Sequence, residues 1–381
     1  MHVSVLEIQL PQSRFPLALH REMRYDKQVM YAFGGTKNMK LNTQYALEET
    51  LRLLSIDSPT GYTRHVTDHL LAELAEMGFS PVRTRKGAVC CCLGGEGHPL
   101  ALAAHVDTLG LMVRHIQSNG HLSFTRVGGP SYQAVETENV TVVTREGKRY
   151  TGVVQLKNAS THVNHDMDSA KRDHSTMEVL LDENVSSADD VRALGVDVGD
   201  FICLDPRSRL TESGYIRSRF LDDKLSAGML MALAKGVSEG AVQLKRKVYI
   251  FFSVYEEVGH GASSGLPQDV EDLLVVDMGC VGDELTCTEM QVSICAKDSG
   301  GPYDYEMTGE LVSLCKANDI DYALDVYPFY GSDAGTALRS GCDIRYALIG
   351  AGVYASHGYE RSHKKGVENS LRLIEAYVEK E

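Results

Sequence analysis

The sequence contains no apolar run that approaches the ~20 residues a helix needs to span a bilayer. It also shows no charged start followed by an apolar core and a small-residue cleavage site, the pattern of a secretory signal. Basic residues are outnumbered, with 38 lysines and arginines against 52 aspartates and glutamates, and the net charge is -14. We therefore expect neither a membrane nor a nucleic acid as a partner.

Cysteine pairs of the C-x-x-C type are also missing, although the chain has nine cysteines. Cys90, Cys91 and Cys92 stand together in an apolar, strand-like run. Adjacent residues of a strand point to opposite faces, so these three make a poor disulfide or zinc framework. We interpret them as reduced core residues and expect a cytoplasmic protein.

The remaining composition is that of a soluble globular chain, with 381 residues, 43% hydrophobic and 24% charged. Residues 1–38 show no sustained period, and we expect a dispensable extension there. Short apolar strands and helices with 3.6-residue spacing fill 39–112 and 213–381. Short β-like runs separated by glycine turns fill 113–212. The predicted fold is α/β, a mostly parallel mixed sheet flanked by helices, with an inserted small β-rich domain.

The apolar run at 248–254 indicates a strand buried on both faces, and it leads directly into Glu256 and Glu257. In open α/β sheets the ligand crevice lies beyond the carboxyl ends of the strands. Two adjacent acids there repel each other unless a cation or a shared proton offsets the charge. A lone acidic pair is more often a solvated loop, so this motif needs support from other strand ends.

Three other apolar strands end in similar residues. The strand at 99–104 leads into His105 and Asp107, which lie on one face of an extended chain and suit a metal ligand with a carboxylate beside it. The full set of strand-end and helix-start candidates is His105, Asp107, Asp222, Glu256, Glu257, Asp277 and His357. Two histidines and several carboxylates suit two divalent ions such as zinc, cobalt or manganese. A carboxylate that stays unbound, for which Glu256 fits, can take the proton of the activated water.

A second cluster of potential ligands lies at 158–176, which contains His162, His165, Asp166, Asp168, Asp173 and His174. The spacing matches neither a helical pair nor a tight turn. A solvated loop explains the cluster better than a second metal site.

The ordered motifs AAHVDTLGLMV, LGVDVGD, RFLDDK, YEEVGHGA, VVDMG, GSDAG and SHGYERSH resemble the TET-type metallo-aminopeptidases, the deblocking and glutamyl aminopeptidase family. The resemblance covers the chain from about residue 43 to the end. It implies that His105 and Asp277 hold one ion, that Glu257 and His357 hold the other, and that Asp222 bridges them. It further implies Glu256 as general base and Asp107 as the acid that supports His105.

The same resemblance implies an aminopeptidase acting on peptide substrates, with 39–112 and 213–381 as catalytic domain and 113–212 as dimerisation domain. It also implies a homo-oligomer in which dimers build a dodecamer. Thr108 and Ser332 depart from the residues usual in the family, which places substrate specificity in question rather than catalysis.

Two other functions are compatible with these residues. A related dinuclear-metal amidohydrolase, a deacylase or carboxypeptidase, would act on small N-acyl amino acids or dipeptides. A non-catalytic scaffold would have lost ligands, and none is missing here.

Overall fold

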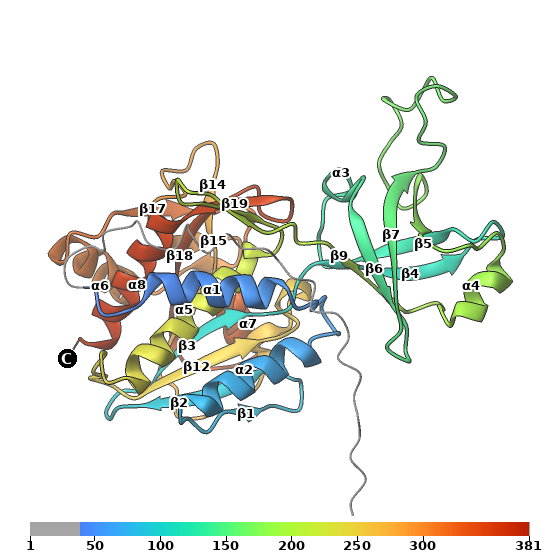
Figure 1. The fold of residues 1–381 in the computed structure, drawn as a ribbon. Coiled ribbons are helices and arrows are strands. Elements are labelled where there is room, and N and C mark those ends of the chain that lie inside the picture. Colours follow the sequence, from blue (N-terminus) through green and yellow to red (C-terminus); the bar gives the residue numbers. More distant parts are fainter. Residues whose placement is uncertain (1–38, 381) are drawn as a thin grey trace, which may run out of the picture. The chain divides into compact units, whose positions relative to one another are not determined.

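The computed structural model describes residues 39–380, so the extension predicted at 1–38 lies outside the described part of the chain. The described residues form a 13-stranded mixed sheet and a closed barrel, seen in Figure 1 as two separate groups of strands. Both groups agree with the fold class predicted from the sequence, a helix-flanked mixed sheet with an inserted β-rich domain, which is therefore confirmed.

Four parallel strands form the centre of the large sheet, in the order β12 (Val248–Ser253), β3 (Leu100–His105), β13 (Asp272–Val276) and β18 (Arg345–Tyr354). Every residue of β3 and β13 is buried, as expected for parallel strands covered on both faces. Because parallel strands end at the same edge, the residues that follow them arrive on one side of the sheet.

The other strands extend this core on both sides. One edge is made by β2 (Val89–Gly94) and β1 (Val82–Arg83), and the opposite path runs through β19 (Glu360–His363), β11 (Tyr215–Ser218) and β10 (Arg209–Leu210). Two further strands pair with β18, namely β14 (Gly279–Val281) and β15 (Val292–Asp298). Strand β15 in turn pairs with β16 (Gly301–Pro302) and β17 (Tyr322–Val326).

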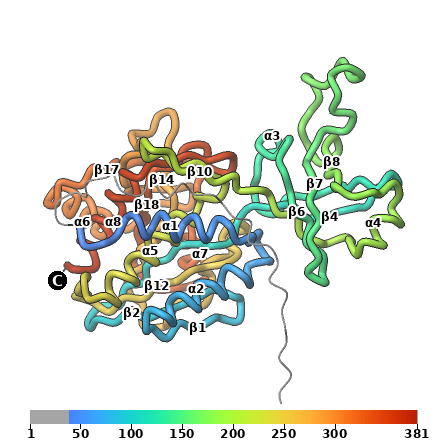
Figure 2. Tube along the Cα trace, viewed as in Figure 1, coloured from blue at the N-terminus to red at the C-terminus, as the bar shows by residue number. Residues whose placement is uncertain are grey.

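Helix α5 (Leu221–Ser238) is the most deeply buried helix in the described chain because it packs on β3 and β18 and is covered by α1 (Thr43–Leu54), as Figure 2 shows. The two helices approach so closely that a Cβ at Gly228 would lie 2.2 Å from Thr50 Oγ1. The sheet domain also contains α2 (Arg64–Glu76), α6 (Tyr305–Ala317), α7 (Asp333–Arg339), α8 (Lys364–Val378) and the short 3₁₀ helices η2 (Glu256–Val258) and η3 (Gly261–Ser263). Because α5 packs on β3, the first residues of α5 stand beside the carboxyl end of that strand.

The barrel closes in the order β4-β5-β8-β7-β6-β9 and has its own apolar interior. Its strands are β4 (Gly110–Ile116), β5 (Leu122–Val127), β6 (Asn139–Val143), β7 (Arg149–Leu156), β8 (Met177–Leu181) and β9 (Phe201–Leu204), with the short helices α3 (Tyr132–Val135) and α4 (Ala188–Leu194) between them. Phe124, Val154 and Val179 are fully buried, so the barrel has a packed core of its own. The barrel strands run from residue 110 to residue 204, whereas the sequence places the insertion at 113–212.

Two details differ from the sequence analysis. Strand β15 was not predicted, because Val292, Ser293 and Ile294 lead into a polar Lys297-Asp298 end without a clear period. Cys92 is exposed, so only Cys90 and Cys91 of that run are core residues, and the prediction of three core cysteines was wrong. Cys92 shares a face with Cys90 but lies near the end of β2, where the neighbouring strand shifts register. All nine cysteines are free thiols.

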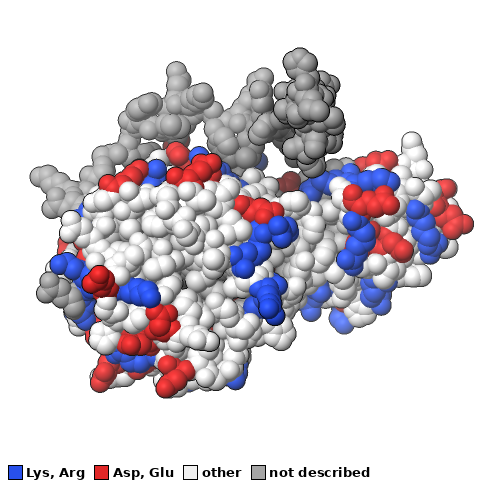
Figure 3. Space-filling view, turned by 90° about the horizontal axis from the view of Figure 1, so that it is seen from below, with Lys and Arg blue, Asp and Glu red and all other residues white. Residues whose placement is uncertain are grey.

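Between residues 39 and 380, no helix combines the length and apolar character that crossing a membrane requires. On the face drawn in Figure 3, acidic and basic side chains are interspersed. The acidic excess is thus not gathered into one block on that face.

Candidate active site

The candidate ligands converge at the carboxyl edge of the four parallel strands. His105 is the last residue of β3, Asp277 directly follows β13, and Glu256 and Glu257 form η2 just after β12. Tyr255, which precedes them, has a φ of 70°, and this left-handed residue turns the chain sharply out of the strand. Asp222 enters from the start of α5 and His357 from the loop between β18 and β19. All seven side chains predicted from the sequence belong to this one region.

The first cluster with metal-ligand spacing consists of His105, Asp222 and Asp277. One ligand atom from each lies within 4.8 Å of the others, and all three residues are buried. His105 Nε2 lies 3.1 Å from Asp222 Oδ1. His105 Nδ1 faces the carbonyl oxygen of Asp107 at 2.9 Å and can only donate to it, so Nε2 is the ring nitrogen that faces the cluster.

The second cluster consists of Asp222, Glu257 and His357, again within 4.8 Å. His357 Nε2 lies 3.4 Å from Glu257 Oε2 and 3.6 Å from Asp222 Oδ2. Asp222 therefore presents one oxygen to each histidine. Two overlapping clusters that share one carboxylate form the arrangement expected for two bridged ions.

The Asp107 side chain supports the loop of the two glutamates. Its Oδ1 accepts a hydrogen bond from the Glu256 backbone N–H at 3.1 Å, and its Oδ2 lies 3.4 Å from the backbone nitrogen of Glu257. Thr60 Oγ1 donates to the same Oδ2 at 2.6 Å. Asp107 is fully buried, so these bonds fix the position of η2 without competition from water.

Glu256 stands beside the clusters without belonging to either. Its Oε2 lies 3.8 Å from His105 Nε2, and its side chain is 14% exposed. Burial raises the pKa of Glu256 well above its ordinary range. A carboxyl group of raised pKa at the edge of the ligand set is a suitable proton acceptor and donor.

The electrostatics of the clusters fit divalent cations. Burial raises the pKa of Glu257, and the charge of Asp222 raises it further. Burial likewise raises the pKa of Asp277 to about 7. Burial opposes the ionised form of Asp222, yet the hydrogen bond and charge of His105, with the charge of His357, lower its pKa. Glu257 Oε1 is buried and has no hydrogen-bond partner. Buried acids that raise one another's pKa, with an orphaned oxygen among them, suit a site that a cation completes.

Three buried acids in the quoted motifs were not assigned a role by the sequence analysis. Glu360 accepts hydrogen bonds from the backbone N–H groups of Asp222 and His357, both at 3.1 Å. Asp223 Oδ2 accepts from the His105 backbone N–H at 3.1 Å. Asp333 Oδ1 accepts from the Ala262 backbone N–H at 2.6 Å and thereby anchors η3. Each holds the backbone of a ligand or its loop, a function that leaves no pattern in the sequence beyond the motif itself.

The two departures from the family pattern are buried. Thr108 is 2% exposed, and its backbone pairs with Ser58 and Thr60. Ser332 is also 2% exposed and caps α7 by accepting from the Ala334 backbone N–H. Among residues 39–380, the 158–176 loop contributes no cluster with metal-ligand spacing.

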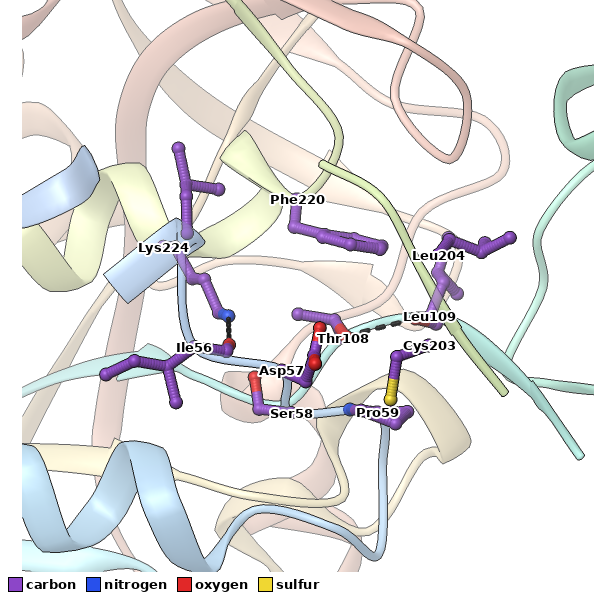
Figure 4. Close-up of a pocket in the computed structure, with 11 residues that line it drawn as sticks. Ile56, Asp57, Ser58, Pro59, Thr108, Leu109, Cys203, Leu204, Phe220 and Lys224 are labelled. Carbon is purple, nitrogen blue, oxygen red and sulfur yellow. Dashed lines mark hydrogen bonds between the residues drawn. The ribbon is translucent and has the colours of Figure 1, made fainter. Parts of the chain in front are cut away.

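A small pocket lies beside the end of α1, and Figure 4 shows its lining. It contains none of the seven predicted residues. Lys224 points into this region and donates from Nζ to the carbonyls of Leu53 at 2.9 Å and Ile56 at 2.7 Å. Burial lowers the pKa of Lys224 to about 7. The lysine satisfies carbonyls at the C-terminal end of α1 and so ties α5 to α1.

Comparisons with known proteins identify the family of this chain. The sequence profile of the M42 glutamyl aminopeptidase family matches residues 87–373. YhfE of Bacillus subtilis (strain 168) is 41% identical over 335 residues, covering 87% of this chain and 97% of YhfE.

Two solved structures share the fold. The TET aminopeptidase of Thaumarchaeota archaeon SCGC AB-539-E09 has a TM-score of 0.80 at 21% identity, over 88% of this chain and 97% of that chain. The Pyrococcus horikoshii TET1 peptidase, which can assemble into a tetrahedron or a large octahedral shell, has a TM-score of 0.77 at 21% identity, over 87% of this chain and 99% of that chain. On the profile match and the similarity to YhfE, the chain belongs to the M42 glutamyl aminopeptidase family, the TET-type metallo-aminopeptidases, and is a peptide-bond hydrolase.

Proposed function

We propose that this protein removes N-terminal residues from peptides with two divalent ions and a glutamate base. The supporting observation is that Asp222 belongs to both ligand clusters. His105 and Asp277 would hold one ion, Glu257 and His357 the other, and Asp222 would bridge them. Ions bound there would polarise the scissile carbonyl and lower the pKa of a water molecule.

Glu256 is the residue that moves the proton in this proposal. It takes a proton from the attacking water and returns it to the leaving amine. Its raised pKa makes the Glu256 carboxylate a stronger base toward the attacking water, because a carboxylate of ordinary pKa is a weak base at neutral pH. Asp107 holds the Glu256 backbone in place through the hydrogen bond described above.

The charges around the site favour an aminopeptidase over a deacylase or carboxypeptidase. A carboxypeptidase needs a cationic side chain for the substrate carboxylate. Arg219 and Lys224, the cations nearest in sequence to Asp222, are occupied by Glu138 and by backbone carbonyls. Lys86, which interacts with the charges of Asp333 and Asp107, donates to the carbonyls of His260 and Gly261. The acid-rich edge instead suits the α-ammonium group of a free N-terminus.

The ion identity and the assembly are also part of the proposal. Histidine and carboxylate ligands suit zinc or cobalt, with manganese as a further candidate. We propose a homo-oligomer in which the inserted barrel serves dimerisation and dimers assemble to a dodecamer. The assembly of the TET1 peptidase supports this part, and light scattering of the purified protein would test it.

The function is tested with a rate profile over aminoacyl amides, measured after chelation and after return of zinc, cobalt or manganese. The expected result is metal-dependent cleavage of amides that carry a free amino group. The matched panel contains the same residues with the amino group acylated. Faster cleavage of that acylated panel would favour the deacylase alternative.

A further inference from the structure

The inserted barrel domain reaches the candidate metal site with two glycines, because Gly128 packs on Glu257 and the carbonyl of Gly129 faces His357. His357 Nδ1 lies 3.3 Å from the carbonyl oxygen of Gly129, in the turn that follows β5. A carbonyl can only accept, so the ring proton stands on Nδ1 and Nε2 keeps its lone pair for the cluster. A Cβ at Gly129 would lie 3.3 Å from the same Nδ1, so the turn packs directly on the ring.

A buried arginine connects the same segment to the loop that contains His357. Arg219 is 2% exposed, and its guanidinium donates to the carbonyl of Gly358 at 3.2 Å and to the carbonyl of Ala134. It also pairs with Glu138 Oε1 at 2.9 Å. Gly358 directly follows His357, whereas Ala134 and Glu138 lie between β5 and β6 of the barrel. We call Arg219 and Glu138 the clasp.

The clasp depends on the charge of Glu138. This side chain is 7% exposed, and its Oε1 also lies 2.7 Å from Arg207. A guanidinium buried without a counter-ion is strongly unfavourable. Arg219 without Glu138 would therefore turn toward water and give up the Gly358 carbonyl. The loop that contains His357 would then lose the hydrogen bond from Arg219 that helps to hold it in place.

The other histidine has no such dependence. His105 Nδ1 faces the carbonyl of Asp107, which follows the same strand, and the His105 backbone N–H donates to Asp223 on α5. All of these groups belong to the large-sheet domain. The two histidine rings thus obtain their orientation from different parts of the chain.

We propose that the clasp is a positioning device through which the inserted barrel sets the ion affinity of the Asp222–Glu257–His357 cluster and leaves the His105 cluster unaffected. This inference rests on the proposed two-ion function. It assigns the barrel a role inside each subunit, separate from any role in assembly. Neither Arg219 nor Glu138 belongs to a ligand cluster, and Arg219 reaches the His357 loop through the carbonyl of Gly358.

The experiment measures ion binding rather than turnover. The full-length protein is stripped with a chelator and titrated with zinc by competition with a chromophoric chelator, so that each site has its own dissociation constant. Glu138→Gln should weaken one site by about 10- to 100-fold and change the other by no more than about twofold. His357→Ala should lose that same weakened site and thus identifies it.

Arg149→Gln is the matched control, because the Arg149–Asp57 ion pair also joins the barrel to the sheet domain but does not involve the His357 loop. It should leave both dissociation constants unchanged. A melting curve verifies that each variant is folded. If Glu138→Gln does not fold, Arg219→Lys replaces it, since lysine keeps the charge but not the planar fork, and the same one-site loss is expected.

The outcomes separate the inference from the function on which it rests. Two normal sites in Glu138→Gln, or equal weakening of both sites, would overturn the clasp while the two-ion function stands. A native protein that binds fewer than two ions would overturn both.

Discussion

The Asp107 Oδ1 atom accepts a hydrogen bond from the Glu256 backbone N–H at 3.1 Å, so the acid at the end of one strand positions the proposed base at the end of its neighbour. The same carboxylate lies farther from His105, with Oδ1 3.7 Å from Nδ1. The Asp107 backbone carbonyl, at 2.9 Å, is the closer partner of that ring. One residue thus supports the ligand with its backbone and the two glutamates with its side chain.

Asp107→Asn should slow turnover while ion binding persists. An amide has one acceptor oxygen, so one of the two N–H groups of η2 would lose its acceptor and the base would be less well positioned. We expect kcat to fall on the order of 10- to 100-fold, with zinc content unchanged. Thr60→Val, which removes only one donor to the carboxylate, is the control and should have a smaller effect. An unchanged kcat in Asp107→Asn would contradict the positioning role.

Glu256→Gln should separate proton transfer from ion binding. Glutamine keeps the shape of the side chain but cannot accept the proton of the attacking water. We expect kcat to fall on the order of 10²-fold or more, with both ions retained. Parallel kinetics and metal analysis would check this. Full activity in the variant would rule out Glu256 as the base, and loss of an ion would show that it is a ligand.

Gly261→Ala should disturb the loop that follows the two glutamates. A Cβ at Gly261 would lie 1.7 Å from Asp333 Oδ1, the atom that anchors η3, so the loop or the carboxylate must move. We expect a loss of about 1–3 kcal/mol in the free energy of unfolding, together with lower kcat. Gly282→Ala, where the added Cβ meets nothing within 4 Å, is the control. Equal effects of the two substitutions in denaturant unfolding would show that the close packing has no consequence.

The free energy of unfolding should depend on pH through His69 of α2, which pairs with Glu49 of α1. His69 Nε2 lies 2.6 Å from Glu49 Oε1, and Glu49 is fully buried. The hydrogen bond to Glu49 raises the pKa of His69 above its ordinary value of 6.5. A histidine whose pKa is higher in the folded state stabilises fully below the unfolded pKa, and that contribution is lost as pH rises through the folded pKa.

His69→Gln should therefore destabilise the protein by about 1.5–3 kcal/mol at pH 6 and by less in alkaline solution, where the native imidazole is neutral. Urea unfolding of both proteins across this pH range measures the difference. A difference that does not change with pH would show that the histidine is neutral throughout.

The buried strands and the residues directly after them could be predicted from the sequence. An apolar strand that ends in a histidine or an acid has a readable pattern, and parallel strands bring their ends to one edge. This pattern was sufficient to identify His105, Glu256, Glu257 and Asp277 as neighbours. The pattern was insufficient to predict β15, because the polar residues at the end of this strand interrupt the apolar run of its buried first half.

A local sequence pattern carries information about one element at a time, so the chemistry of the strand ends could be inferred from the sequence. The groups that hold these strand-end residues in place are apparent only in the three-dimensional fold. Gly129 and His357 are separated by 228 positions, and a glycine carbonyl has no side chain that a pattern could reveal. Arg219 and Glu138 look like surface charges in the sequence, and they are buried because the barrel folds against the loop of His357.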